Sequence, residues 1–248
     1  KQAVKERLIP YNPCENCRIP PKDKKEMTIL PPEKIGRYLQ EAEKYGVLPM
    51  FYLELSSGLR RGELLALQWT DLNVKERILT VNKQVTRMEG ELDVTEPKTK
   101  NSVRKVALSQ QAVDLLVQEH EQHPDNPILF PSPRTGGYWS PDAVSRINRK
   151  LLKNAGIEEH MRFHDLRHTF ATMAISSGVD VKTLSSMLGH YSVGFTLDTY
   201  THITNDMQRG AAEKIGGFME SATATPTPEP PDLPEKSRCK VIPFEKVG

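Results

Sequence analysis

The chain has 248 residues, 37% of them hydrophobic, and a formal net charge of +2 with a pI near 8.4. This length supports one sizeable core with linkers and tails, and the small net charge gives no overall nucleic-acid signature, so any basic surface must come from local clusters. The lack of an apolar run near membrane-spanning length argues against a transmembrane protein. Three Cys without a signal-like start predict a reducing, cytoplasmic setting.

The first 26 residues are predicted to be the end of a preceding domain followed by a linker. The stretch KQAVKERLI is typical of closing helical turns, which Pro10 ends, and a polar, Pro-containing segment follows. A chain that begins at Lys1 without Met indicates a fragment. Cys14 and Cys17 have half of the ligands that a structural zinc site needs, but no second Cys pair exists, so we interpret them as linker thiols.

A compact domain is expected from residue 27 onward, beginning with helical segments. Prolines 31 and 32 favour a helix start, and residues 48–57 carry an apolar stripe that predicts a buried helix. This helix leads into the sequence SGLRRGE, followed by a second short helix. Arginines 60 and 61 suit bidentate phosphate recognition because their donors are planar and permanently charged. An ion pair with Glu63 or Asp71 is the alternative.

The next segment changes from helical to strand periodicity. The stretches RILTVNKQVT, ELDVT and SVRKVALS predict three short antiparallel strands, with Gly90 in the first turn and PKTKN in the second. The fold class is therefore predicted to be mainly α with a small antiparallel three-stranded β-sheet (α+β). Lys98 and Lys100 lie at the second hairpin tip with Arg104 beyond it. This basic finger suits phosphate contact, or alternatively keeps an exposed edge soluble.

Two amphipathic helices are expected after the strands. Ser109 is a predicted cap for residues 109–120, and Pro141 suits the first helical position of the second helix. The second helix places Arg146, Arg149 and Lys150 outward, opposite its apolar stripe. These side chains form a second basic surface, which is a candidate DNA contact.

Residues 162–202 carry the remaining polar pattern. His164 and Arg167 are three residues apart in a predicted helix, so they share a polar face. Gly189 suits the stop of a short apolar helix, which places His190 at its end, and Tyr200 follows ten residues later.

Taken in order, these motifs resemble the tyrosine recombinase (phage integrase) family. The resemblance covers roughly residues 27–215 and is carried by GLRRGELLALQWTDL, PKTKNSVRKVAL, FHDLRHTFAT and MLGHYSVGFTLDTYTH. These stretches look most like integrases of mobile elements such as conjugative transposons. The set is specific as an ordered series and weak one motif at a time. It implies the fold of a tyrosine recombinase catalytic domain.

The resemblance implies a role for each matching residue. Arg60 and Arg167 would clamp the phosphate, and Tyr200 would attack it to give a 3′-phosphotyrosyl link without metal or nucleotide cofactor. His164 would accept the tyrosine proton, and Lys98 would protonate the departing 5′-oxygen. His190 would hydrogen-bond the phosphate.

Three of these assignments have rivals nearby. The family pattern places the active arginine directly after Gly-Leu, which favours Arg60 over its neighbour. Lys100 shares a strand face with Lys98, so the hairpin lysine is Lys98 or Lys100. Tyr191 is a rival by residue type, but the Thr-Tyr-Thr-His context favours Tyr200 as nucleophile.

Domains and partners follow from the same resemblance. We expect residues 1–26 to end a core-binding domain, 27–220 to form the catalytic domain and 221–248 to be a Pro-rich tail. Expected partners are a double-stranded DNA crossover site, other protomers in a tetramer that resolves a Holliday junction, and an excisionase or DNA-bending protein. A type IB topoisomerase-like activity and a non-catalytic DNA-binding module are the alternatives.

Overall fold

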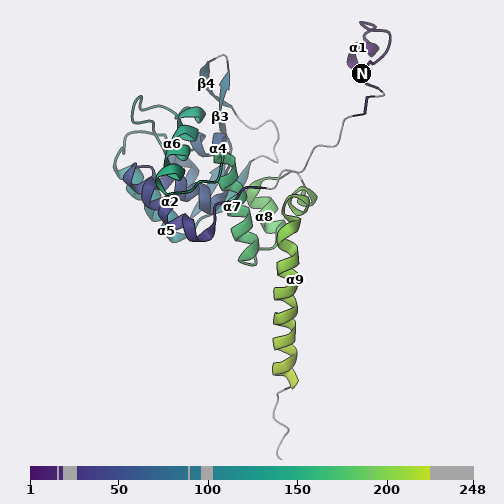
Figure 1. Cartoon of the computed structure of the whole chain (residues 1–248). Helices are drawn as coiled ribbons and strands as arrows, with labels where there is room; N and C mark the ends of the chain where they lie inside the picture. The colour runs from purple at the N-terminus through teal and green to yellow at the C-terminus, as the bar shows by residue number, and fades with distance from the viewer. Residues whose placement is uncertain (16, 19–26, 89, 96–102, 191, 224–248) are drawn as a thin grey trace, which may run out of the picture. The chain divides into compact units, whose positions relative to one another are not determined.

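The computed structural model describes residues 1–15, 17–18, 27–88, 90–95, 103–190 and 192–223, with part of the side chains from residue 198 onward left out. The chain divides into two compact units, residues 1–200 and 201–248. The first unit contains most of the secondary structure, and Figure 1 shows its elements by label. The predicted division at residues 26 and 220 stays a prediction.

Helices dominate the described chain. Their bounds are α1 Gln2–Lys5, α2 Pro32–Lys44, α3 Leu48–Ser57, α4 Arg61–Ala66, the 3-10 turn η1 Trp69–Asp71, α5 Gln110–Glu121, α6 Pro141–Asn154, α7 Phe163–Ser176, α8 Val181–Leu188 and α9 Val193–Thr223. Ser109 caps α5 as predicted, because its hydroxyl accepts from the Ala112 N–H at 3.2 Å. In the described part of the chain, no helix is long and apolar enough to cross a membrane.

The strands are short and form two separate antiparallel sheets. Their bounds are β1 Leu72–Asn73, β2 Ile78–Val81, β3 Gln84–Met88, β4 Glu91–Thr95 and β5 Arg104–Ala107. One sheet has the order β1-β2-β5, with Leu79 opposite Val106, and the other is the β3-β4 hairpin. In Figure 1 this hairpin stands at the top of the body, above the labels of α4 and α6. The predicted class, mainly α with small antiparallel sheets, is confirmed.

The prediction of which segments form the three-stranded sheet was wrong. Residues 77–86 were expected to form one strand, but the chain leaves β2 at Asn82 and starts β3 at Gln84. Between them, the Lys83 ammonium donates to both carboxylate oxygens of Asp71, at 2.6 and 2.8 Å. The strand is thus interrupted at residues 82 and 83, and β3 pairs with β4 instead of extending β2.

Helix α3 is the central element of the core. Its apolar character over nearly all faces matches its position, since it packs against α2, α5 and α7. Phe51 on α3 lies between the rings of Tyr38 and Phe163, with ring centroids 5.9 and 5.7 Å away. This packing fixes α7 beside the end of α3, where Gly58 follows.

Two helix ends carry a left-handed glycine next to this core. Gly58 ends α3 with φ +60°, and Gly189 ends α8 with φ +64°. A Cβ on Gly58 would lie 2.3 Å from Cδ1 of Phe170, so both the backbone angle and the packing require glycine. These two ends present their last carbonyl groups to the same region.

Helix α9 differs from the predicted final helix. That helix was expected after Tyr200, but α9 begins at Val193 and includes Tyr200 within its span. The predicted tail over residues 221–248 lies almost wholly outside the described residues.

Candidate active site

The candidate site contains a buried carboxylate, that of Glu63, which two arginines bind. Glu63, on the first turn of α4, accepts hydrogen bonds from the Arg60 backbone N–H at 2.9 Å and from the Arg60 guanidinium at 2.8 Å. Arg104 donates to its two oxygens at 3.0 and 2.7 Å. Burial raises the pKa of Glu63, but the bonds and charges of Arg104 and Arg60 outweigh it and lower the pKa to about 2. Glu63 is therefore ionised at pH 7.

Arg104 is buried against Glu63. The sequence-based prediction that it is a DNA contact on the hairpin surface was therefore wrong. Its side chain is 6% exposed, and its Nε donates to the Met187 carbonyl at 2.7 Å. A Cβ on Gly189 would lie 3.0 Å from Cδ of Arg104, so the glycine gives this arginine room. The structure thus makes Arg104 a link between β5, α4 and the end of α8.

The two arginines predicted to clamp phosphate are held by the carbonyl ends of α3 and α8. Arg167 donates to the Gly58 and Leu188 carbonyls, each at 2.7 Å. Arg60 donates to the Gly189 carbonyl at 3.0 Å. The C-terminal end of a helix favours positive charge, so both helix ends help to hold the guanidiniums.

Arg60 and Arg167 differ in their exposure. The Arg60 side chain is 42% exposed, whereas Arg167 is 3% exposed. Burial, together with the nearby positive charge of Arg60, lowers the pKa of Arg167 to about 10, which still leaves it charged at pH 7. The site therefore offers one accessible and one deeply anchored guanidinium.

His164 is neutral at pH 7. It lies on the first turn of α7, one turn before Arg167, and its ring centroid is 5.0 Å from that of His168. Partial removal from water, with His168 and Arg167 nearby, lowers the pKa of His164 to about 4. A neutral imidazole can accept a proton, as the predicted base must.

His190 directly follows the glycine that ends α8. Its Nδ1 lies 2.7 Å from the hydroxyl of buried Thr196, and its ring packs edge-on against Phe195. Burial, followed by the charges of Arg167 and Arg60, lowers the pKa of His190 to about 4. Because Nδ1 is engaged with the Thr196 hydroxyl, a ligand would have to contact His190 through Nε2.

The structure thus brings Arg60, Arg167 and His190 to one place, with His164 one helical turn away. Tyr200 lies on α9, but its side chain is outside what the structure describes. The other calls that fall outside the described residues are Lys98, Lys100 and Tyr191.

Several contributions to the site were not predicted from the sequence. The carbonyls of Gly58, Leu188 and Gly189 act as anchors that no side-chain pattern reveals, although the two glycines mark the helix ends concerned. The Arg60–Glu63 ion pair, weighed as an alternative to phosphate binding, exists together with a partly exposed guanidinium. The two interpretations are therefore compatible.

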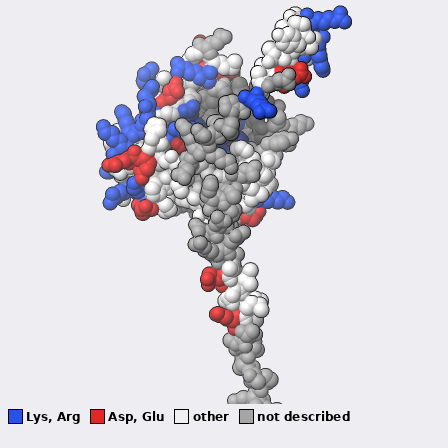
Figure 2. Space-filling view, turned by 45° about the vertical axis from the view of Figure 1, so that its right-hand side comes forward, with Lys and Arg blue, Asp and Glu red and all other residues white. Residues whose placement is uncertain are grey.

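The predicted basic surface on α6 faces solvent. Arg146, Arg149 and Lys150 are all exposed, as the helical pattern predicts. In Figure 2, Lys and Arg side chains gather along the left-hand side of the body, with fewer Asp and Glu among them. The small net charge of the chain therefore conceals an uneven distribution.

The described residues offer no evident metal centre. No group of three or more His, Cys, Asp or Glu side chains among them is arranged to hold a metal ion, and Cys14 and Cys17 are exposed thiols.

A second acidic side chain is buried close to Arg167. Glu54 on α3 is fully buried, and neither of its carboxylate oxygens has a hydrogen-bond partner among the described residues. Burial raises the pKa of Glu54 well above its ordinary value of 4.5, although the positive charge of Arg167 opposes this shift. Glu54 is therefore protonated in the folded state over a pH range where it ionises in the unfolded chain.

Replacing Glu54 with Gln should make the free energy of unfolding less sensitive to pH. In the wild type, the contribution of Glu54 to the free energy of unfolding falls as pH rises above 4.5, because the unfolded state releases the Glu54 proton first, and this fall ends at the raised folded pKa. The stability of Glu54→Gln relative to wild type should therefore rise over this window by up to about 1.4 kcal/mol per pH unit. Urea unfolding at several pH values between 5 and 8 measures this, and an advantage that shrinks with pH would contradict it.

Comparison with known proteins gives a consistent result. Residues 30–207 match the model of the phage integrase family. The ICEBs1 integrase of Bacillus subtilis (strain 168) is 31% identical over 230 residues, covering 88% of this chain and 62% of the relative. A XerC-like tyrosine recombinase of Caldanaerobacter subterraneus is 30% identical over 245 residues with the same two coverages. The chain thus spans about three fifths of the length of these relatives.

Solved structures show the same fold. The Tn1549 transposon integrase in complex with a circular intermediate DNA superposes with a TM-score of 0.72 at 22% identity, covering 86% of this chain and 74% of that one. The XerA recombinase gives a TM-score of 0.62 at 26% identity, covering 78% and 67%. Since the family model matches well over half of the residues, the chain belongs to the phage integrase family of tyrosine recombinases.

Proposed function

We propose that the protein is a site-specific DNA recombinase that cuts and rejoins DNA through a 3′-phosphotyrosine intermediate. The observation that carries this proposal is that Arg60 and Arg167 are both held by carbonyl groups at the ends of α3 and α8, next to His190. Two guanidiniums held in place before substrate arrives can stabilise charge that develops on a phosphate. These cations supply that charge themselves, so the proposed reaction uses no cofactor.

In the proposed cleavage, the Tyr200 hydroxyl attacks the phosphorus and loses its proton to His164. Arg60 and Arg167 hold the non-bridging oxygens, and His190 donates a hydrogen bond to the same phosphate through Nε2. The bond from phosphorus to the 5′-oxygen breaks, and Lys98 gives that oxygen its proton. The covalent intermediate conserves the bond energy, so a 5′-hydroxyl from a partner duplex can reverse the steps and rejoin the strands.

The protonation states of the two histidines agree with their different proposed roles, His164 as base and His190 as hydrogen-bond donor. A base must be neutral before reaction, and the pKa of about 4 for His164 meets this requirement at pH 7. His190 has a similarly lowered pKa, so it is also neutral and donates from Nε2 only in the tautomer that leaves Nδ1 as acceptor for the Thr196 hydroxyl.

We propose double-stranded DNA and further copies of the chain as partners, with a tetramer exchanging strands through a Holliday junction. A solved relative, the lambda integrase, is a dimer on a core site. Residues of α2, α3 and α7 line an apolar pocket of about 410 Å³, among them Leu39, Leu55 and Phe170. Exposed Ile215, Phe218 and Met219 on α9 provide apolar side chains that a neighbouring copy could place there.

Integration and excision of a bacterial mobile element is the proposed biological role, supported by the names of the ICEBs1 and Tn1549 relatives. By the same reasoning, residues 1–26 end a core-binding domain, and an excisionase or DNA-bending protein assists the reaction. The bacterial relatives support a cytoplasmic setting.

Wild-type protein should form a denaturant-resistant adduct with a nicked suicide substrate, and Tyr200→Phe should form none. The phenylalanine lacks only the attacking oxygen, so DNA binding should change less than threefold. The readout is a shifted band on a denaturing gel, with binding measured in parallel.

The matched control is Tyr191→Phe, which removes the rival hydroxyl and should leave adduct formation intact. An adduct that persists in Tyr200→Phe and disappears in Tyr191→Phe would reassign the nucleophile. Binding of a cognate site without any adduct in the wild type would favour a non-catalytic DNA-binding module.

A further inference from the structure

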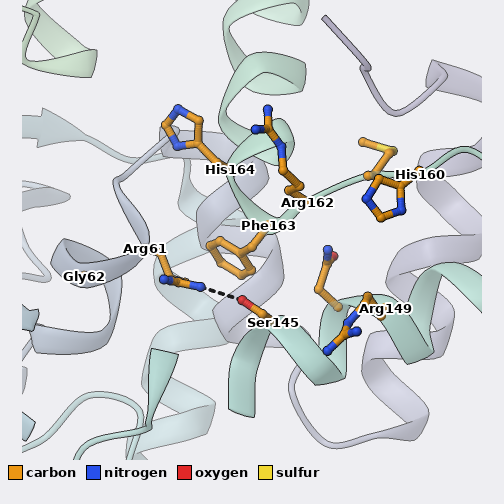
Figure 3. A pocket seen from close by; sticks show the side chains of 10 residues that line it. Arg61, Gly62, Ser145, Arg149, His160, Arg162, Phe163 and His164 are labelled. Atoms are coloured by element: carbon orange, nitrogen blue, oxygen red, sulfur yellow. Dashed lines mark hydrogen bonds between the residues drawn. The ribbon is translucent and has the colours of Figure 1, made fainter. Parts of the chain in front are cut away.

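A pocket of about 480 Å³ opens beside His164 and is separate from the carbonyl anchors of the clamp. Its walls come from the start of α4, from α6 and from the residues that lead into α7. Figure 3 shows Arg61, Arg149, Arg162 and His160 around it, with His164 at one edge. His164 therefore borders both this pocket and the candidate active site.

The functional groups that line the pocket carry positive charge or donate hydrogen bonds. Three arginines and two histidines line it, and no Asp or Glu is among its lining residues. The Arg61 guanidinium is fixed by the Ser145 hydroxyl at 2.6 Å and the Pro141 carbonyl at 3.2 Å. Arg162 is partly neutralised by Asp165, at 2.8 Å. Such a set favours an anionic ligand with several acceptor oxygens.

Two lining side chains have donors that nothing in the described chain uses. Asn148 is fully buried, and its Oδ1 accepts from the Tyr38 hydroxyl at 2.7 Å, while its Nδ2 has no partner. Arg149 next to it has an exposed side chain and no hydrogen bond or ion pair within the described residues. The Asn148 Nδ2 atom is closed to solvent, so among these two side chains it is Arg149 whose donors a ligand in the pocket can reach.

We propose that this pocket binds an uncut backbone phosphate of the DNA strand that Tyr200 cleaves, adjacent to the scissile phosphate that Arg60 and Arg167 hold. The inference rests on the proposed function, because it takes DNA as the substrate. Arg61 and Arg149 donate to the phosphate oxygens, and Met161 and Phe163 provide an apolar wall for the deoxyribose. A second anchored phosphate fixes the strand along its length, which places the scissile phosphate for attack.

The test combines Arg149→Gln with DNA in which single phosphates are replaced by neutral methylphosphonates. In the full chain, Arg149→Gln should weaken binding roughly tenfold and make the negative slope of log K against log salt shallower by about 0.9. At one uncut phosphate near the cleavage site, the methylphosphonate should weaken wild-type binding but change Arg149→Gln binding less than twofold. Losses that add at every position would overturn the proposal.

Lys75→Gln is the matched control, since it removes one exposed positive charge in the turn before β2, away from the pocket. It should show no coupling to any single phosphate. Titration with inorganic phosphate separates the two sources of this ligand: phosphate binding that Arg149→Gln abolishes, without coupling on DNA, would assign the pocket to a free anion and overturn the proposal.

Adduct formation at saturating DNA keeps the two claims distinct. Coupling between Arg149→Gln and one methylphosphonate, without any adduct, would support phosphate binding in the pocket and contradict the proposed catalysis. An adduct without such coupling would contradict phosphate binding in the pocket and support the catalysis.

Discussion

Replacing Arg167 with Lys should lower the rate of covalent cleavage roughly 10²- to 10³-fold, the loss typical of one preorganised donor to a developing oxyanion. Arg167 spans the Gly58 and Leu188 carbonyls with two different nitrogens, each at 2.7 Å. A lysine ammonium has one nitrogen and cannot keep both anchors while it also contacts a phosphate. Single-turnover adduct formation on a suicide substrate measures the rate.

Arg37→Lys, on the exposed face of α2, is the control for this arginine-to-lysine change. It should leave the cleavage rate within twofold of wild type. Thermal unfolding of both variants, with cleavage measured well below their midpoints, separates lost chemistry from lost folding. A rate for Arg167→Lys within fivefold of wild type would show that the anchored guanidinium is not needed in the transition state.

Replacing Glu63 with Ala should reduce the free energy of unfolding by about 3–5 kcal/mol at pH 7, because it leaves the buried Arg104 guanidinium without its counter-charge. Arg60 loses its carboxylate partner in the same change. Urea unfolding followed by circular dichroism measures the effect. Asp142→Ala is the control, since its ion pair with Arg87 is mostly exposed and should contribute under about 1 kcal/mol.

The stability that Glu63 contributes should also depend on pH. Its pKa is lowered to about 2 in the folded protein, from an ordinary value of 4.5. The contribution is therefore fully present above about pH 5 and is lost as pH falls toward 2, so the difference between wild type and Glu63→Ala should shrink over that window. A difference that stays constant from pH 7 to pH 3 would contradict the lowered pKa.

Much of the helical architecture follows from the sequence alone. The apolar pattern predicted α3 over 48–57, and Gly189 was predicted to stop the helix before His190; the structure confirms both. The order of the motifs also indicated the family, which the comparisons confirm. Helices are readable in this way because their hydrogen bonds and caps join residues only a few positions apart.

Strand pairing and the environment of the charged groups depend on contacts between distant segments. The local sequence does not reveal that Lys83 forms an ion pair with Asp71 and lies outside a strand, so β2 and β3 were predicted as one strand. Arg104 was predicted to be a surface DNA contact because it follows the lysines of the predicted hairpin tip, yet it is buried against Glu63 and the end of α8.

The residue types and order along the chain therefore determined the helices, the family and the candidate roles of Arg60, His164, Arg167, His190 and Tyr200. Only the tertiary structure decided which of those groups meet, which carbonyls hold them and which acids are buried beside them. The physical reason is that helix formation is a local equilibrium. By contrast, burial, ion pairing and pKa shifts arise where α3, α4, α7 and α8 come together.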